Sequence, residues 1–318
     1  MTENEKKVTV KELVTEQLQK KNSPDFEGML VIRKEAGYTS HDVVARLRRI
    51  LGMRRIGHTG TLDPMAVGVL PVLLGKATRL TTLLEDRVKT YETVVRLGLT
   101  TDTQDISGTV LRESPVMTDR EQVMAAAQSF EGDQLQVPPM YSALKVDGRK
   151  LYELAREGIT VERKARPVTF YRIEMLWCEL PLAAFSVTCS KGTYIRTFCH
   201  DLGDKLGCGA CMQELTRTAV GDFDLSHAFT LSQVEEAAGQ GRVGEMIVGL
   251  EKVLGEYPGR QTIPEADRLL LNGNSVPFEM VSCSTCEDEK IRLSTSGGKF
   301  CGIYRLDENR YCPVKMFI

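Results

Sequence analysis

The sequence predicts an α+β fold with a mixed, largely antiparallel sheet, followed by a small C-terminal β-barrel. The chain has 318 residues, 42% hydrophobic and 26% charged, which is typical of a globular protein too long for one hydrophobic core. Helix-like and strand-like segments alternate irregularly, without the βαβ rhythm of a doubly wound sheet. From about Arg260 onward, short strand-like pieces are separated by glycine turns.

Three segments are predicted along the chain. Residues 1–26 read as a polar extension with one helix, because Thr9 and Glu12 form a capping box, and "NSPDFEG" reads as a linker. The main domain is predicted over 27–250. A small domain is predicted over 258–318, after the turn-rich "EYPGR".

The main domain is expected to begin with a strand, "MLVIRK", and then a helix with Ser40 as its N-cap. The buried stripe of this helix would be Val43, Val44, Leu47, Ile50 and Leu51. Three further segments have the composition of strands: "TYETVVRLG", "VTFYRIEMLW" and "FSVTCS". Two more helices are expected, in "TDREQVMAAAQSF" with a capping box from Thr118 to Glu121, and in "TLSQVEEAAGQG".

The nine cysteines are an odd number in a large chain without a signal-peptide pattern, so we expect reduced thiols in a cytoplasmic protein. Two CxxC pairs occur, and small buried hydrophobic residues are a better interpretation than a structural zinc site. The zinc alternative stays open for the second pair and two later cysteines: Cys283, Cys286, Cys301 and Cys312. The first pair is Cys208 and Cys211.

A net charge of −2 hides a strongly basic segment between Arg33 and Arg55. This segment contains seven basic residues and only two acidic ones, Glu35 and Asp42. Two interpretations stay open, a solvated helix face and contact with RNA or phosphate.

The glycine-rich stretch "RRIGHTGTLDPMAVGVLPVLLGKATRL" holds one carboxylate, Asp63. A P-loop is excluded, because Leu70 and Ala77 occupy the positions that need glycine and a hydroxyl residue. Four histidines without a ligand motif give little support to a metal hydrolase. A single aspartate instead favours covalent catalysis, provided that a neighbouring cation keeps its pKa low, although Asp63 as a cap of the local turn remains an alternative.

The stretch "GHTGTLDPMAVGVLPVLLGKAT" closely resembles the catalytic motif of the TruB family of bacterial tRNA pseudouridine-55 synthases. The resemblance continues in family order over roughly residues 28–250. It includes "GYTSHDVV", "KTYE", "LGLTTDTQDISG", "VPPMYSALKVDGRKLYELAREG", "CSKGTYIRTFCHDLGDKLGCGA" and "LTRTAVGDF".

The resemblance implies isomerisation of a uridine in the T-loop of tRNA, without cofactor or metal, by a catalytic domain of the pseudouridine synthase fold. Asp63 matches the family nucleophile, whether it attacks the ribose or promotes a glycal intermediate. Arg196 matches the arginine that pairs with this aspartate, and Tyr91 matches the tyrosine that stacks on the base and helps to move a proton. The partner would be tRNA, bound by a monomer.

The uridine has to be flipped out of the T-loop to reach a carboxylate. Tyr194 and Leu215 match family pocket residues, Lys34 matches a family position, and His58 matches the histidine that fills the space left by flipped bases. A structural role for His58 beside a turn stays open. The family's usual "KPxG" proline is absent, because Glu35 and Ala36 follow Lys34, and this departure would loosen the turn.

The segment near 132–158 resembles the family's RNA-gripping insertion, with Lys145, Arg149 and Lys150 able to meet phosphates. Its alternative is an ordinary basic loop and helix. The tail resembles a short PUA domain, a small RNA-binding barrel. Two rival functions remain: an RNA-binding, tRNA-folding chaperone without catalysis, and a synthase that is guided by a separate RNA or acts on other RNAs.

Overall fold

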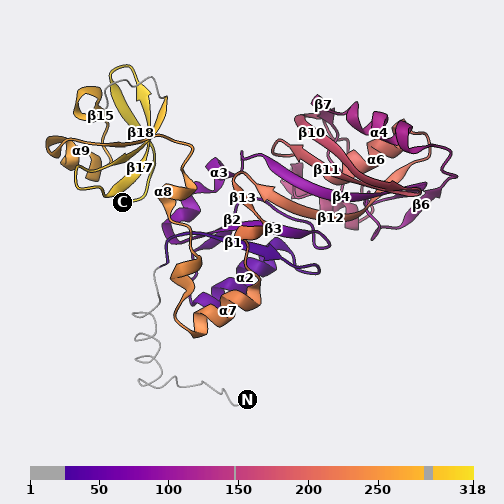
Figure 1. Ribbon diagram of the computed structural model, residues 1–318, viewed down its shortest axis with the longest axis horizontal. Helices are drawn as coiled ribbons and strands as arrows, with labels where there is room; N and C mark the ends of the chain where they lie inside the picture. Colours follow the sequence, from indigo (N-terminus) through magenta and orange to yellow (C-terminus); the bar gives the residue numbers. More distant parts are fainter. Residues whose placement is uncertain (1–25, 147, 283–288) are drawn as a thin grey trace, which may run out of the picture.

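A computed structural model describes residues 26–146, 148–282 and 289–318 (Figure 1). The helix expected within 1–26, with its capping box of Thr9 and Glu12, lies almost wholly outside these residues, and so do Cys283 and Cys286. The proposed extension and the second CxxC pair therefore stay predictions from sequence.

The main sheet of the described chain is nine-stranded and mixed. Its strands follow one another in space as β1 (Gly28–Lys34), β3 (Val67–Leu74), β12 (Ala210–Val220), β4 (Lys89–Leu97), β11 (Leu182–Cys189), β10 (Arg166–Glu179) and β7 (Gly132–Gln136). Two short strands join the side of this path, β2 (Ile56–His58) on β3 and β13 (Phe223–Asp224) on β12. Only the β12–β3 pair of this sheet is parallel, so the predicted largely antiparallel sheet is confirmed.

Helix α2 (Ser40–Leu51) packs its apolar stripe against the β1–β3 end of this sheet. Its N-cap is Thr39, not Ser40, because the Thr39 side chain accepts from the Asp42 N–H while the Asp42 carboxylate accepts from the Thr39 N–H. Ser40 is instead the first helical residue, and it is buried. The predicted stripe is otherwise correct, with Ile50 only partly buried.

Helix α4 (Arg120–Gln128) begins one residue later than its sequence suggested. Its capping box pairs Asp119 with Gln122, so the expected pair of Thr118 and Glu121 is wrong. A carboxylate at the cap accepts the backbone N–H at least as well as a threonine hydroxyl, and the Thr118 hydroxyl hydrogen-bonds to Gln122 instead. Helix α7 (Leu231–Gly239) has Thr230 as its N-cap and matches the predicted helix.

Helix α6 (Ile195–Lys205) packs on the face of β12 and β4, with Phe198 and Leu202 in the largest core cluster. The remaining helical elements between residues 75 and 253 are short: η1 (Gly75–Leu80), α3 (Thr81–Leu84), α5 (Leu151–Arg156), η2 (Leu225–His227), η3 (Val243–Met246) and α8 (Leu250–Val253). Two small hairpins complete this part, β5 (Leu99–Thr101) with β6 (Val110–Glu113), and β8 (Lys145–Val146) with β9 (Arg149–Lys150).

The C-terminal part forms a curled half-barrel sheet at one end of the molecule (Figure 1). Its five strands run in the order β14 (Gly259–Gln261), β16 (Lys290–Ser294), β17 (Phe300–Asp307), β18 (Arg310–Met316) and β15 (Val276–Pro277). The short helical elements η4 (Pro264–Ala266), α9 (Asp267–Leu271) and η5 (Phe278–Met280) accompany it. Ile303 and Phe317 pack into a core cluster shared with β1 and β3, which ties this part to the main sheet.

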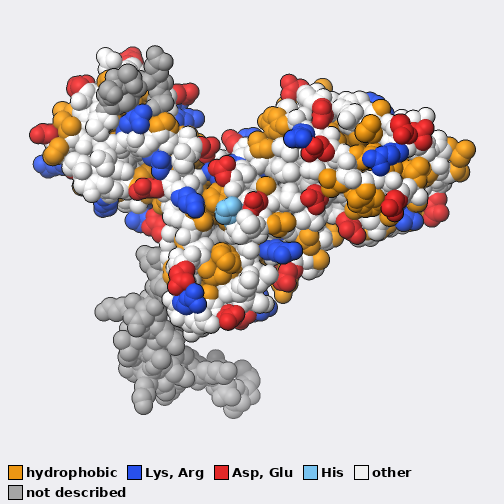
Figure 2. Space-filling model, viewed as in Figure 1, with side chains coloured by type: hydrophobic (Ala, Val, Ile, Leu, Met, Phe, Trp, Pro, Cys, Tyr) orange, Lys and Arg blue, Asp and Glu red, His pale blue; other side chains and the backbone are white. Residues whose placement is uncertain are grey.

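Cys208, Cys211 and Cys301 are buried thiols, which agrees with the interpretation of these cysteines as small core residues. None of the helices in the described segments is long and apolar enough to cross a membrane. On the face shown in Figure 2, Lys and Arg side chains are interspersed with Asp and Glu side chains.

Candidate active site

A cavity of about 830 Å³ opens where the glycine-rich loop after β2 meets the start of β4 and the turn into α6. Six of the predicted site residues line it: His58, Asp63, Tyr91, Tyr194, Arg196 and Leu215. Lys34 and the three basic residues of the insertion, Lys145, Arg149 and Lys150, are not among its lining residues. The fold thus gathers residues from four distant segments around one cavity.

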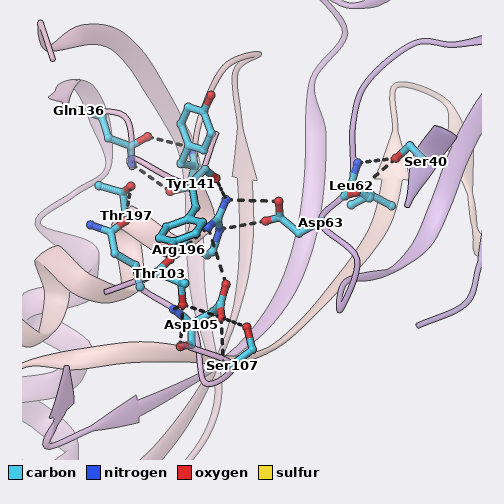
Figure 3. Close-up of polar contacts among 12 residues, drawn as sticks. Ser40, Leu62, Asp63, Thr103, Asp105, Ser107, Gln136, Tyr141, Arg196 and Thr197 are labelled. Atoms are coloured by element: carbon cyan, nitrogen blue, oxygen red, sulfur yellow. Dashed lines mark hydrogen bonds and ion pairs between the residues drawn. The ribbon is translucent and has the colours of Figure 1, made fainter. Parts of the chain in front are cut away.

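Asp63 and Arg196 form a two-point ion pair at this cavity (Figure 3). The Arg196 Nε lies 2.9 Å from Asp63 Oδ2, and its Nη2 donates to Oδ1 at 3.2 Å. The arginine side chain is 5% exposed and the aspartate side chain 35%. The carboxylate is therefore held in one orientation and remains open to a ligand in the cavity.

Arg196 is fixed by more than its partner. It is the second residue of α6, and its guanidinium donates to the carbonyls of Thr103 at 3.1 Å and Tyr141 at 2.7 Å. A second carboxylate, Asp105, lies 3.7 Å from its Nη1. Asp105 is itself held by the hydroxyls of Thr103 at 2.8 Å and Ser107 at 2.5 Å. The guanidinium is thus held by three loops, which carry Asp63, Tyr141, and Thr103 with Asp105.

The pKa of Asp63 is raised above its ordinary value of 3.8, because burial disfavours the charged form. Arg196 opposes this rise, and the nearby Asp105 adds to it. The expectation that a cation keeps the pKa of Asp63 low is therefore wrong in its net sign. The physical reason is that the sequence indicated the cation but not the depth of the site or the second carboxylate.

The loop that carries Asp63 is fastened on both sides. Ser40 at the start of α2 accepts from the Leu62 N–H at 2.8 Å, and its hydroxyl donates to the Leu62 carbonyl at 3.3 Å (Figure 3). After Asp63, the Pro64 carbonyl accepts from the Gly37 N–H at 2.9 Å and from Lys34 Nζ at 3.1 Å. The loop is thus positioned by the first strand and the first described helix.

Lys34 holds this loop in place through its hydrogen bond to the Pro64 carbonyl. Its ammonium also donates to the carbonyls of Glu35 at 3.0 Å and Tyr38 at 2.6 Å, so all three N–H groups are used. Burial lowers the pKa of Lys34 to about 8, and Asp63 opposes this shift. The turn that lacks the family proline is therefore closed by the lysine itself, with Gly37 at a φ of +85°.

The two tyrosines differ in how they are held. Tyr91 is 8% exposed, and burial raises its pKa, so its phenol is neutral at neutral pH. Tyr194 precedes α6, and the Gln136 side chain brackets its backbone by accepting from its N–H at 2.8 Å and donating to its carbonyl at 3.1 Å. Both rings border the cavity that Asp63 enters.

His58 also borders the cavity and has a buried Nδ1 without a hydrogen-bond partner among the described residues. Burial, and then the nearby Arg217, lower the pKa of His58. The imidazole is therefore neutral at physiological pH, and it offers one polar atom that the protein itself leaves unsatisfied.

Arg217 on β12 is a cavity residue that reasoning from sequence missed. It is 1% exposed, and its guanidinium donates to the carbonyls of Val69 at 2.7 Å and Gly60 at 3.3 Å. It thereby links the loop that carries Asp63 to the parallel β12–β3 contact. The sequence signal that could have found it is an arginine inside a strand, because a buried charge is costly unless it has hydrogen-bond partners or a functional role.

The basic residues of the insertion lie on the β8–β9 hairpin and outside the cavity. Lys145 stands opposite Lys150, and Arg149 forms an ion pair with Glu157. Two like charges on adjacent strands repel each other unless an anion lies between or above them. The basic stretch from Arg33 to Arg55 is partly used internally, because Arg48 donates to the Ile56 carbonyl and Arg46 pairs with Glu235.

The site combines a partly buried carboxylate with a raised pKa, a fixed guanidinium and a neutral phenol in a cavity that can hold a small ligand or one nucleotide. Within residues 26–146, 148–282 and 289–318, no group of three His, Cys, Asp or Glu side chains is placed to hold a metal ion. The arrangement can support nucleophilic attack by Asp63 with its charge controlled by Arg196.

Comparison with known proteins identifies the family. Residues 48–195 match the model of the TruB family pseudouridylate synthase (N terminal domain), and residues 196–254 match that of the tRNA pseudouridylate synthase B C-terminal domain. Proteins named tRNA pseudouridine synthase B from Clostridium kluyveri and Cupriavidus pinatubonensis are 41% and 43% identical over 92% of this chain, and the matches span 100% and 94% of those proteins.

Among solved structures, a chain of a Cbf5-Nop10-Gar1 complex is 27% identical, with a TM-score of 0.70 over 92% of this chain and 85% of that one. The residues matched by the two family models thus include the loop of Asp63, the strand β4 with Tyr91 and the helix α6 with Arg196. The chain belongs to the TruB family of pseudouridylate synthases.

Proposed function

We propose that this protein is a tRNA pseudouridine synthase that converts the T-loop uridine at position 55 into pseudouridine. The observation that carries the proposal is the two-point pair of Asp63 and Arg196 at the wall of a nucleotide-sized cavity. The names of the relatives, tRNA pseudouridine synthase B, support the substrate class.

The reaction is an isomerisation, so the atoms balance without a cofactor. The bond from the ribose C1′ to uracil N1 breaks, a bond from C1′ to C5 forms, C5 loses a proton and N1 gains one. Asp63 would attack the ribose or promote a glycal intermediate, while Arg196 holds its carboxylate in place. Tyr91 would stack on the base, and its neutral phenol can take part in moving the proton.

The uridine has to leave the T-loop stack to enter the cavity. His58 would fill the space that the flipped bases leave, and Tyr194 and Leu215 would form pocket walls. Lys145, Arg149 and Lys150 would meet phosphates of the RNA outside the cavity, together with the PUA-like tail. We propose that the protein acts as a monomer.

The rival function is an RNA-binding chaperone that folds tRNA without catalysis. Both functions predict RNA binding, so only turnover separates them. A chaperone has no need of a carboxylate with a raised pKa whose orientation is fixed by an arginine, which is why the synthase is the better proposal.

The test is tritium release from a tRNA transcript with 5-tritiated uridine, incubated with the purified protein in EDTA. Wild type should release tritium and place pseudouridine at position 55, while Asp63→Asn should bind the transcript and release none. Asp222→Asn, an exposed aspartate outside the cavity lining, is the matched control and should behave as wild type.

Tight binding without release by the wild type would favour the chaperone. Release that maps to another uridine would overturn position 55 only. Loss of binding by Asp63→Asn would indicate an aspartate that caps the local turn.

A further inference from the structure

Lys89, the first residue of β4, is a cavity-lining cation for which the reaction described above has no role. It lies two residues before Tyr91, so both side chains point to the same face of the sheet. The whole residue is 7% exposed. Lys89 is therefore a buried cation at the wall of the proposed active site.

Two of the three Lys89 N–H groups are used by the protein. Nζ donates to the carbonyls of Glu85 at 2.5 Å and Arg87 at 2.7 Å. The structure gives no ion pair between Lys89 and any carboxylate of the residues it describes. This contrasts with Lys191 at the rim of the same cavity, which pairs with Asp86.

The surroundings make a lone ammonium costly here. Burial, and then the Arg217 guanidinium on the neighbouring strand, lower the pKa of Lys89 to about 8. Cys189 on β11 and the acidic side chains Asp86 and Glu85 oppose this shift. A buried cation without a counter-ion is costly, and a bound anion would remove most of that cost.

We propose that Lys89 binds a phosphate oxygen of the RNA strand when the target nucleotide enters the cavity. Phosphate is the anionic group that a nucleotide brings with it, and the third N–H of Lys89, which has no partner among the described residues, can donate to it. Arg166 is a further cation that lines the same cavity. The inference rests on the proposed function, since it needs RNA in this cavity.

Phosphate binding at Lys89 couples to its protonation. An adjacent anion favours the charged ammonium, so the pKa of Lys89 should be higher in the complex than in the free protein. Above about pH 8 the free protein has to take up a proton in order to bind. RNA affinity should therefore fall between pH 7 and pH 9, and this part of the fall should vanish when Lys89 is replaced.

The experiment measures the dissociation constant for a T-arm hairpin RNA over a series of salt concentrations, at pH 7 and pH 9. Lys89→Met should weaken binding about tenfold at pH 7 and reduce the slope of log affinity against log salt by about 0.7–0.9, the value for one lost phosphate contact. Lys89→Arg should keep the slope, because it keeps the cation.

Lys205→Met is the matched control, because Lys205 is exposed at the end of α6 and packs on the Phe130 ring, away from the cavity. It should bind as wild type does. Lys89→Met also removes the donors to two carbonyls, so Lys89→Gln, whose amide NH2 keeps N–H donors without the charge, is measured beside it with thermal unfolding of both. Lys89→Gln should show the same loss of slope.

Weaker binding with an unchanged salt slope would assign Lys89 a structural role and overturn the phosphate contact. Wild-type affinity and slope in both neutral variants would also overturn it. Failure of the proposed function looks different, because the wild type itself would then bind the hairpin weakly or convert no uridine in the tritium assay.

Discussion

The replacement Arg196→Met tests whether the arginine acts on Asp63, the carboxylate that we propose as the nucleophile. Methionine keeps an unbranched apolar stem but removes the two contacts to Asp63 and those to the Thr103 and Tyr141 carbonyls. It leaves Asp63 and Asp105 facing each other without a cation between them. The pKa of Asp63, already raised by burial, should rise further because its main opposing influence is gone.

The magnitude follows from the geometry. Two unit charges about 4 Å apart attract by about 4 kcal/mol at an effective dielectric constant of about 20, and breaking a buried pair costs about 3–5 kcal/mol. If that energy is lost from the transition state, the single-turnover rate constant should fall between about 150-fold and 5,000-fold. Because Arg196 is 5% exposed, RNA affinity should change little.

The assay is single-turnover formation of pseudouridine with enzyme in excess over tRNA, beside the equilibrium affinity for the same tRNA. Arg242→Met is the matched control, because Arg242 pairs with Glu245 at the surface with 61% of its side chain exposed. An exposed pair contributes at most about 1 kcal/mol, so this control should keep wild-type turnover. A rate constant for Arg196→Met within about fivefold of wild type would refute the catalytic role of the pair.

Three further outcomes follow from particular contacts. Gly68→Ala should lower the free energy of unfolding by roughly 2–5 kcal/mol in chemical denaturation, because Gly68 has a φ of +107° and its new Cβ would lie 2.2 Å from the Arg217 carbonyl oxygen. Gly37 has a φ of +85° and open space around its Cα, so Gly37→Ala should lower the free energy of unfolding by only about 1–2 kcal/mol. Equal losses in the two variants would contradict the argument that the Cβ contact at Gly68 is what costs stability. As the pH is lowered, turnover should be lost at a midpoint above pH 3.8, the ordinary pKa of an aspartate, because the carboxylate of Asp63 has to be charged and burial raises its pKa. A midpoint at or below pH 3.8 would contradict this. Removal of residues 260–318 should weaken tRNA binding and its salt dependence, and lower the melting temperature because the packing of Ile303 and Phe317 is lost; unchanged affinity would contradict an RNA-binding tail.

The pattern of the sequence was sufficient for much of the local structure. The capped helix after Thr230 and the strands around "TYETVVRLG" and "VTFYRIEMLW" are found where their periodicity and β-branched content indicate. The predicted N-caps Ser40 and Thr118 are each one residue away from the observed ones, Thr39 and Asp119. Adjacent residues can all cap a helix, and the cap is the one whose side chain also has a partner three residues later. Neither error changed the fold.

The sequence by itself determined the α+β class, the isolation of Asp63 in a glycine-rich loop and the family resemblance, because these depend on residue type and on order along the chain. Only the tertiary structure decided that Asp105 lies beside Arg196, that Arg217 and Lys89 border the same cavity, and that the pKa of Asp63 is raised rather than lowered. These features arise from burial and from contacts between segments more than 90 residues apart, as in the pairing of Arg196 with Thr103. Desolvation depends on what surrounds a group in three dimensions, and local sequence carries little of that information.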